Sequence, residues 1–372
     1  MTDEKETHVS MPRRSSATRS ATTRRSALVV LVMVVLASLL GTPTAAAERP
    51  VTSVPGPAQR PPAVVFDSDM DFDDASTLAL LCNLDLQGRL DLRAVTITGN
   101  GMGLPGRAEV HAATILRRCG LPTVPIGTAN PAPSPGGNTV SPDSRVRFER
   151  VLTDALGDAA ATSGPLPAAD QLVRQVVAES RGRVTILATG PLTTPARLLT
   201  DPRIRARIDR VVAMGGAFDV PVNIFGPRAA GFDKSQEVNI WLDPRAAATV
   251  NAAARPGQLT FIPLDATDSV PVSSDLIERL PRTPAGNIVR DIMQHPSMPA
   301  MIATGALYWW DPLAALSLVQ PELVRTTAGA VHVTVAGPAA GRTSWAAKGP
   351  RRSVASGADR AAFEQAFLAA LA

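Results

Sequence analysis

Cysteine and lysine are scarce in this chain of 372 residues. The two cysteines, Cys82 and Cys119, lack the paired spacing of a metal–thiolate site. Both lie in apolar helical contexts, so the sequence leaves open either a disulfide, which an oxidising compartment permits, or two buried free thiols. The arginines are scattered and form no polybasic groove, so we expect no nucleic-acid partner.

Long hydrophobic runs are also missing, apart from one near the N-terminus. The apolar stretch from Ala27 to Leu40 is shorter than the roughly 20 residues that span a bilayer, which argues against a stable membrane anchor. Arg24-Arg25 precedes it, and three alanines ending at Ala47 follow it. This pattern predicts a secretory signal peptide over residues 1–47 and a secreted mature chain, with Sec and Tat export both open.

The net charge depends partly on that leader. Residues 1–47 hold six basic and three acidic side chains, so their removal lowers the formal charge from +4 to +1. The basic balance of the whole chain is therefore not the signature of a nucleic-acid-binding surface.

The remaining chain divides into a proline-rich linker, residues 48–62, and one folded domain, residues 63–372. Short β-branched runs alternate with helical patterns, which predicts an α/β fold with a mostly parallel, Rossmann-like open sheet flanked by helices. Helices are expected over 73–84, 107–118, 168–178, 194–199, 244–253 and 361–371, strands at 63–66, 92–98, 122–126, 183–189, 210–216, 238–242, 259–264 and 331–335, and long functional or mobile loops over 127–147 and 216–236.

An unusual concentration of acid follows the first expected strand. The stretch VVFDSDMDFDDA, residues 64–75, holds five aspartates: Asp67, Asp69, Asp71, Asp73 and Asp74. Two carboxylates about 4 Å apart repel by roughly 4 kcal/mol at an effective dielectric constant of 20. Ligands bind beyond the carboxyl ends of strands in such sheets, so the cluster predicts a cation site in a catalytic pocket.

Two known aspartate-rich sites do not fit the stretch. An EF-hand loop that begins at Asp67 requires glycine and glutamate where Phe72 and Leu78 stand. A haloacid-dehalogenase-like phosphatase requires a lysine on a later helix, but the three lysines are Lys5, Lys234 and Lys348, and Lys234 lies in an expected loop. We keep the phosphatase only as a minor alternative.

The stretch FDSDMDFDDA resembles the aspartate fingerprint D-x-D-P-G-x-D-D-A of the inosine-uridine preferring nucleoside hydrolases. Met70 and Asp71 replace the proline and glycine of that fingerprint, which alters the local turn. Further matches follow in the family's order, over about residues 63–371: TITGNG, ILATGPLTTPARLL, RVVAMGGAF, EVNIWLDPRAA and WWDPLAAL. Several ordered matches are more specific than one short motif.

The resemblance implies a calcium-dependent enzyme that cleaves the N-glycosidic bond of small-molecule ribonucleosides to free base and ribose, as in purine salvage. It implies that Ca²⁺ is held by Asp69, Asp74, Asp311 and the backbone carbonyl of Thr189, with Asp69 also the general base. It further implies a substrate-binding set in which Asp73 holds the 2′-hydroxyl, Asn223 and Asp311 the 3′ side, and Glu237 and Asn239 the 5′-hydroxyl, with Asn100 and Met214 at matching positions. Asp67 and Asp243 are expected to be structural.

The leaving base is the point at which this chain differs from many relatives. Where they have a histidine as the leaving-group acid, this chain has Trp310, as purine-preferring members do, and an indole face stacks best on a purine. The histidines after the leader are His111, His295 and His332, and only His295 is expected within reach of a site, if its segment folds over it. The alternative function is a noncatalytic ribose- or nucleoside-binding protein, and the sequence leaves open whether the chain forms a homo-oligomer.

Overall fold

A computed structural model describes residues 60–372 except 130–131, 136, 158–163, 222 and 224–235. The predicted signal peptide and most of the predicted linker lie outside the described residues. Among the helices of the described part, none has both the length and the apolar character that are needed to cross a membrane.

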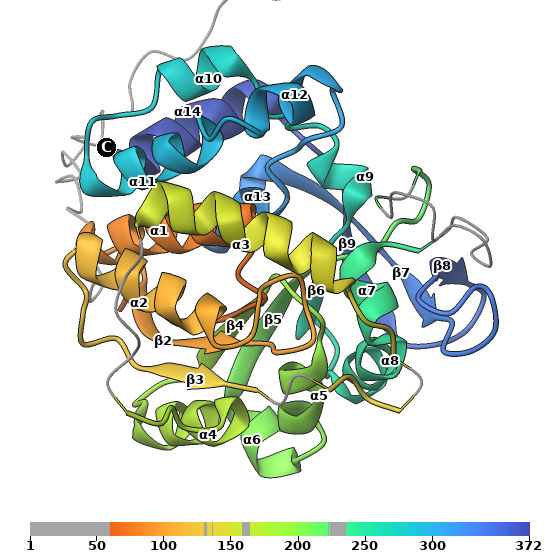
Figure 1. Cartoon of the computed structure of the whole chain (residues 1–372). Helices are drawn as coiled ribbons and strands as arrows, with labels where there is room; N and C mark the ends of the chain where they lie inside the picture. Colours follow the sequence, from red (N-terminus) through yellow and green to blue (C-terminus); the bar gives the residue numbers. More distant parts are fainter. Residues whose placement is uncertain (1–59, 130–131, 136, 158–163, 222, 224–235) are drawn as a thin grey trace, which may run out of the picture. The chain divides into compact units, whose positions relative to one another are not determined.

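A nine-stranded sheet organises the domain, in the order β3-β2-β1-β4-β5-β6-β9-β7-β8 (Figure 1). Neighbouring strands from β3 to β9 in this order are parallel, whereas β7 pairs with β8 and β9 in antiparallel fashion. The predicted mostly parallel sheet is therefore confirmed. The strands are β1 Ala63–Ser68, β2 Asp91–Ile97, β3 Ile126–Thr128, β4 Val184–Ala188, β5 Ile208–Met214, β6 Leu259–Ile262, β7 Val324–Val333, β8 Thr343–Ala346 and β9 Arg351–Ala358.

Helices cover both faces of the sheet, because successive strand residues point to opposite faces and both sets are apolar. In β1, Val64 and Phe66 belong to the larger apolar core, under α1, α2, α11, α13 and α14, while Val65 belongs to the second core, under α4, α5 and α8. The helices are α1 Phe72–Leu86, α2 Arg107–Arg118, α3 Pro142–Leu156, α4 Ala169–Glu179, α5 Thr193–Leu199, α6 Pro202–Arg207, α7 Val238–Leu242, α8 Pro244–Ala253, α9 Leu264–Thr267, α10 Ser274–Glu278, α11 Pro284–Met293, α12 Met298–Ala303, α13 Trp310–Val319 and α14 Arg360–Leu371, with a 3₁₀ turn at Pro321–Leu323.

The register of the central strands brings their carboxyl ends to one edge. Asp67 of β1 lies opposite Thr96 of β2 and Ala188 of β4, and Ser68 lies opposite Ile97. The segments that leave β1, β2 and β4 therefore meet at the same place, which is where the aspartate-rich turn begins.

Three sequence expectations are wrong. The strand expected over 122–126 lies later, as β3 Ile126–Thr128, because a turn in which the Val124 N–H donates to the Leu121 carbonyl oxygen occupies its first residues. The segment 238–242 is not a strand but helix α7, because the side chain of Glu237 accepts the N–H groups of Asn239 and Ile240 and caps a helix. The expected loop 127–147 contains the start of α3, with Ser141 as the N-cap and Pro142 at the first helical position. The helix was not predicted because the start of its sequence is mostly polar.

The two cysteines are free thiols. Cys82 on α1 and Cys119 after α2 are buried and unbridged. The hydrogen bond with Cys119 and burial raise the pKa of the Cys82 thiol. Of the two readings that the sequence left open, the buried free thiols are the one observed.

Candidate active site

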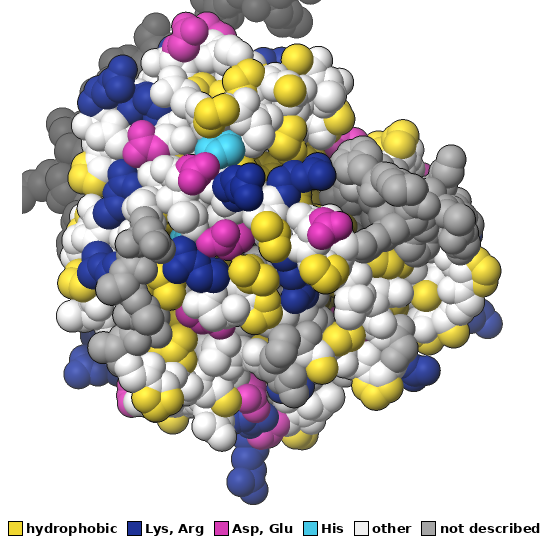
Figure 2. Space-filling model, viewed as in Figure 1, with side chains coloured by type: hydrophobic (Ala, Val, Ile, Leu, Met, Phe, Trp, Pro, Cys, Tyr) yellow, Lys and Arg dark blue, Asp and Glu magenta, His cyan; other side chains and the backbone are white. Residues whose placement is uncertain are grey.

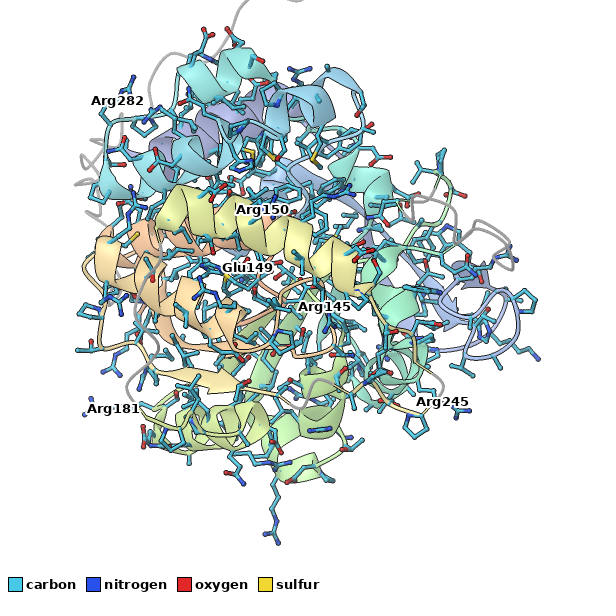
Figure 3. All side chains as sticks on the ribbon, viewed as in Figure 1. Arg145, Glu149, Arg150, Arg181, Arg245 and Arg282 are labelled. Carbon is cyan, nitrogen blue, oxygen red and sulfur yellow. The ribbon has the colours of Figure 1, made fainter. Side chains whose placement is uncertain are left out.

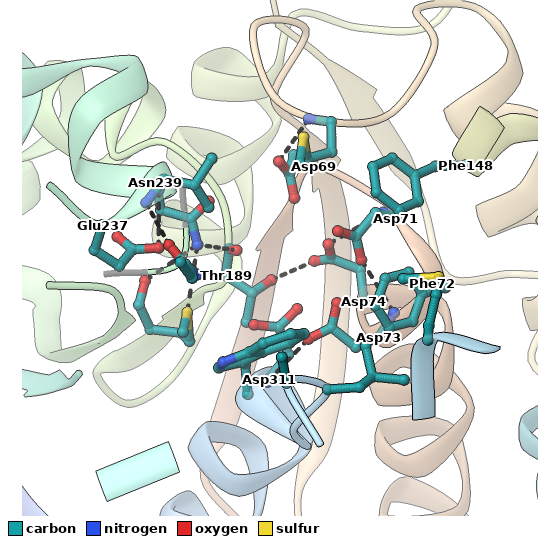
Figure 4. A pocket seen from close by; sticks show the side chains of 18 residues that line it. Asp69, Asp71, Phe72, Asp73, Asp74, Phe148, Thr189, Glu237, Asn239 and Asp311 are labelled. Carbon is teal, nitrogen blue, oxygen red and sulfur yellow. Dashed lines mark hydrogen bonds between the residues drawn. The ribbon is translucent and has the colours of Figure 1, made fainter. Parts of the chain in front are cut away.

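A pocket opens where the carboxyl ends of β1, β2, β4 and β5 meet, and carboxylates from several elements converge in it (Figure 4). No lysine, arginine or histidine is among the described residues that line it. The lining residues are Asp69, Asp71, Phe72, Asp73, Asp74, Met102, Phe148, Thr189, Met214, Asn223, Glu237, Val238, Asn239, Met301, Ala306, Leu307, Trp310 and Asp311.

The turn between β1 and α1 places the first carboxylates. Asp71 is the N-cap of α1: its side chain accepts the N–H of Asp73 at 3.0 Å, and its own N–H donates to Asp74 Oδ2 at 3.1 Å. Met70, buried in the turn, has a φ of 54°. Proline is locked near −65°, so the fingerprint's proline does not fit this turn, and Asp71 orders it through the capping box instead.

Asp74 is fixed at the centre of the cluster. Its Oδ1 accepts hydrogen bonds from Ser68 Oγ at 2.7 Å and from Thr189 Oγ1 at 2.5 Å. Together with the N–H of Asp71 at Oδ2, these bonds hold the carboxylate in one orientation. A ligand carboxylate held in this way needs little reordering when a cation binds.

Asp69 lies in a cradle of backbone. Its Oδ2 accepts the N–H of Met102 at 2.7 Å. A Cβ on Gly101 would lie 2.0 Å from Asp69 Cβ, and one on Gly103 would lie 2.2 Å from the Asp69 carbonyl oxygen. A Cβ on Gly190 would lie 2.9 Å from Asp69 Cβ, so only glycine permits this approach from either strand end.

Asp311 at the start of α13 completes the cluster. Its N–H donates to Asp73 Oδ2 at 3.4 Å, which ties α13 to α1. Carboxylate oxygens of Asp71, Asp73, Asp74 and Asp311 all lie within 4.8 Å of one another. Asp69 lies beside this group, because after burial the charge of Asp74 is the next cause that raises the pKa of Asp69. This donor set of hard, negatively charged oxygens fits a divalent cation that prefers oxygen ligands.

The electrostatics of the cluster also fit a cation. Burial, followed by neighbouring carboxylates, raises the pKa of Asp69, Asp73 and Asp311 well above the usual range, and raises that of Asp74 to about 6. Without a cation, these carboxyl groups resist ionisation because their charges would repel one another. A bound divalent cation would stabilise the ionised form of all of them.

A second set of polar groups lies across the pocket, on the β4, β5 and α7 side (Figure 4). Asn239 donates from Nδ2 to the carbonyl oxygen of Thr189 at 2.8 Å and lies 3.4 Å from the carbonyl oxygen and the sulfur of Met214. Glu237 accepts the N–H groups of Asn239 and Ile240, and of Gly216 at 3.1 Å. Asn223 Oδ1 accepts the N–H of Val238 at 3.0 Å.

Aromatic side chains form a third wall. Phe72 lies between Phe148 and Trp310, with ring centroids 5.8 Å and 6.4 Å away. Tyr308 lies edge-on to Trp310 at 5.8 Å. Its neighbour Trp309 is different, because it is fully buried in the core against Phe367.

Most of the residues that the sequence nominates line this pocket, but Asn100 is outside the lining set. Its amide donates to Thr193 Oγ1 at 3.1 Å, and Thr193 in turn donates to Asp243. Asp243 caps α8, and Asp67 accepts from Thr96 at 2.6 Å, which agrees with the structural roles expected for both aspartates.

The three histidines among the described residues lie away from the pocket. His111 is buried on α2, His332 is exposed on β7, and His295 contacts Ser297 and, at 3.1 Å, Asp154. Neither His295 nor the other two is among the lining residues. The condition under which His295 was expected to reach the site is therefore not met.

Sequence reasoning missed much of the apolar wall. Phe72, Phe148, Met102 and Met301 line the pocket, but apart from Phe72 they lie outside the matched motifs. Only Phe72 could have been nominated from the sequence, because it stands within the aspartate stretch. The other three are single apolar residues in loops or helices, which are too common to indicate a pocket.

Residues 64–365 match the family described as inosine-uridine preferring nucleoside hydrolase. The chain belongs to this family. The nucleoside hydrolase match covers every element that contributes to the pocket, and the expected enzyme class, cleavage of N-glycosidic bonds, is thereby confirmed.

Individual members agree with this assignment. A pyrimidine-specific ribonucleoside hydrolase, RihA, from Photobacterium profundum is 28% identical over 277 residues, which are 70% of this chain and 80% of that protein. An inosine-uridine preferring nucleoside hydrolase structure from Bacillus anthracis has a TM-score of 0.67 at 24% identity, covering 83% of this chain and 99% of that one. A purine-preferring ribonucleoside hydrolase structure from Gardnerella vaginalis has a TM-score of 0.66 at 23% identity, covering 83% and 98%. At these identities the two structures establish the shared fold.

Proposed function

We propose that this chain hydrolyses the N-glycosidic bond of purine ribonucleosides with the help of a calcium ion held at the aspartate cluster. The observation that carries the proposal is the convergence, in one pocket, of Asp69 and Asp74 from the β1–α1 segment, the Thr189 segment after β4, and Asp311 of α13, which are three separate parts of the chain. A fold has no need to bury so many carboxylates without a cation or a proton between them.

The ligand set proposed for calcium is Asp69, Asp74, Asp311 and the carbonyl oxygen of Thr189. A hard divalent cation bound by these residues would lower the pKa of a water molecule and so supply a nucleophile. Asn239 already orients the Thr189 carbonyl, and Ser68 and Thr189 orient Asp74. The chain therefore supplies both the ligands and the partners that orient them.

The other proposed roles are those of the general base and of the residues that bind the ribose hydroxyl groups. Asp69 is proposed to take the proton of the attacking water. Its close backbone contacts fix the carboxylate, and a general base must lie within hydrogen-bond distance of the proton that it accepts. Asp73 and Asn223 are proposed to receive ribose hydroxyls. Both oxygens of Glu237 already accept backbone N–H groups, so a ribose hydroxyl would share an oxygen that also holds α7 in place.

Purine preference is proposed from the aromatic wall. Phe72, Phe148 and Trp310 offer a wide apolar surface, and a bicyclic base covers more of it than a monocyclic one. With no histidine among the described lining residues, the departing base must be helped by stacking and by its own protonation. The matches include both pyrimidine-specific and purine-preferring relatives, so the proposal rests on the wall itself.

The test is product analysis with the mature protein and calcium. Inosine, adenosine, uridine and cytidine are incubated separately, and free base and free ribose are measured. We expect base and ribose in equal amounts, with inosine or adenosine the best substrate. Binding without product would favour the nucleoside-binding alternative, and uridine as the best substrate would overturn the purine preference.

Export is proposed on the signal pattern of residues 1–47 alone, which lie outside the described residues. We expect the chain in the culture medium or cell envelope of its host, beginning at Glu48 after cleavage. N-terminal sequencing of the recovered protein tests this, and an intact Met1 on a cytoplasmic protein would contradict it.

A further inference from the structure

The loop that cradles Asp69 is bound on its outer side by an arginine, Arg145, which lies outside the matched sequence motifs. Arg145 lies in the first turn of α3 and is half-buried (Figure 3). Its Nε donates to the carbonyl oxygen of Gly101 at 3.0 Å, and its Nη2 donates to that of Gly99 at 3.4 Å. One guanidinium edge therefore grips the loop on both sides of Asn100.

This grip is one residue away from the hydrogen bond that orients Asp69. Gly101 precedes Met102, whose N–H donates to Asp69 Oδ2, and Gly103 donates its N–H to the Asp69 carbonyl at 2.8 Å. Because a Cβ on Gly101 would collide with Asp69, the loop backbone packs directly on that side chain. A shift of the loop is therefore transmitted to the carboxylate.

The helix that presents Arg145 is itself anchored. One turn further on, Glu149 accepts from Arg107 of α2 at 3.0 Å, and Arg107 also donates to Thr153 at 3.0 Å. Phe148 packs against Phe72 beside the aspartate cluster. Arg145 thus acts from a rigid support, as a residue that fixes catalytic geometry should.

Charge adds to the contact. Partial burial lowers the pKa of Arg145, while the Asp69 carboxylate raises it, so the guanidinium lies within electrostatic reach of Asp69. Among the described residues, the pocket lining itself contains no cation.

We propose that Arg145 is a positioning residue, which fixes the general base Asp69 by binding the carbonyl oxygens of Gly99 and Gly101 at the same time. The inference rests on the proposed role of Asp69, and one of its tests needs no turnover. A planar fork can bridge two carbonyl oxygens, whereas the single ammonium group of a lysine keeps the charge but not this geometry.

The first test compares Arg145→Ala and Arg145→Lys with Arg147→Ala, a change of an exposed arginine on the same helix. We expect both Arg145 variants to lose about 10- to 100-fold in kcat, because a displacement of about 1 Å can cost 10²-fold, with KM changed less than about threefold. Millimolar methylguanidinium should restore kcat in Arg145→Ala but not in Arg145→Lys. A fully active Arg145→Lys, a rise in KM at unchanged kcat, or no rescue would overturn the proposal.

The second test is independent of activity. Amide hydrogen exchange of the segment 99–103 should accelerate in Arg145→Ala and leave the protection of β1 and β4 unchanged. Arg147→Ala should exchange as the wild type does. Unchanged protection of Met102 and Gly103 in Arg145→Ala would reject the positioning role, even if no nucleoside were hydrolysed by any variant.

Discussion

Aspartates of one cluster differ in what holds them. Asp69 is held by backbone from two strand ends, with glycine at each close approach, while Asp74 is held by two hydroxyl groups and an N–H. Asp69 is proposed as both a calcium ligand and the general base, and its fixed backbone contacts keep it in position for proton transfer, whereas the donors around Asp74 orient it as a ligand only. The two environments support different roles for chemically identical side chains.

Asp69→Asn should abolish hydrolysis while leaving the fold intact. The change keeps the size of the side chain but removes the base and one charge of the ligand set, and loss of a general base costs on the order of 10² or more. Steady-state rates with inosine and a thermal melt in calcium check both parts. More than about a tenth of wild-type turnover would contradict the role of Asp69.

Trp310→Ala should affect natural nucleosides more than an activated substrate. Stacking of a base on an aromatic ring contributes roughly 1 to 3 kcal/mol, so inosine hydrolysis should fall about tenfold to a hundredfold. Nitrophenyl riboside should lose much less, because nitrophenolate leaves without protonation.

The control for Trp310→Ala is Trp345→Ala on β8, where the indole is 38% exposed and packs on Phe218, outside the pocket lining. This variant should retain the rates of both substrates. Equal losses of both substrates in Trp310→Ala would mean that Trp310 only packs the wall.

At the scale of elements, the sequence predicts a helix or a buried strand well where the spacing of its apolar residues fits only one of the two. The helices over 107–118 and 244–253 are found at the predicted bounds, because their apolar spacing and caps agree. Segment 238–242 fails, since its β-branched and aromatic residues favour a strand while a single side chain, Glu237, imposes a helix. The cap is local in sequence, but glutamate is not among the residues that usually cap a helix, so the segment carries no recognisable helix start.

Glu237→Ala should destabilise the protein through α7. The side chain accepts three backbone N–H groups, those of Gly216, Asn239 and Ile240, and its removal leaves them without this partner in the core. Loss of a cap costs about 0.5 to 2 kcal/mol, and buried unpaired groups add to it. We expect a free energy of unfolding lower by about 2 kcal/mol in urea titrations.

The matched control for Glu237→Ala is Glu278→Ala, at an exposed position on α10. It should stay within about 0.5 kcal/mol of the wild type. If Glu237→Ala were as stable as this control, Glu237 would not be a structural cap, and a loss of activity would then report substrate contact alone.

For the whole molecule, the order of motifs predicts the pocket because parallel strands bring their carboxyl ends to one edge. Asp69 after β1, Thr189 after β4 and Met214 in β5 meet for this reason, and Asp311 reaches the same edge at the start of α13. Phe148 and Arg145 could not be predicted in this way. They depend on how α3 packs across the site, which is set by contacts of α3 with α1 and α2 that no local pattern encodes.

The buried carboxylates also make the stability of the whole domain depend on pH. Burial raises the pKa of Asp74 to about 6 and the pKa values of Asp69, Asp73 and Asp311 well above the usual range for aspartate. Without a cation, the folded state therefore binds more protons than the unfolded state above about pH 4. The free energy of unfolding must then fall as the pH rises. Deprotonation is easier in the unfolded state, so a lower proton concentration favours the unfolded state.

Calcium should oppose this pH dependence. In excess chelator, we expect the melting temperature to fall between pH 5 and pH 7, a window in which carboxylates with lowered pKa values, such as Asp201 and Glu364, are ionised in both states and contribute no slope. Calcium at about 100 times its dissociation constant should add about 2.7 kcal/mol to the free energy of unfolding at pH 7 and less at pH 5, because protons compete for the same oxygens.

Differential scanning calorimetry between pH 5 and pH 7, with and without calcium, measures both effects. Calorimetric titrations of calcium in two buffers of different ionisation enthalpy should detect proton release on binding. A melting temperature that is flat in chelator, or that calcium raises equally at both pH values, would mean that the carboxylates do not carry the protons this account assigns to them.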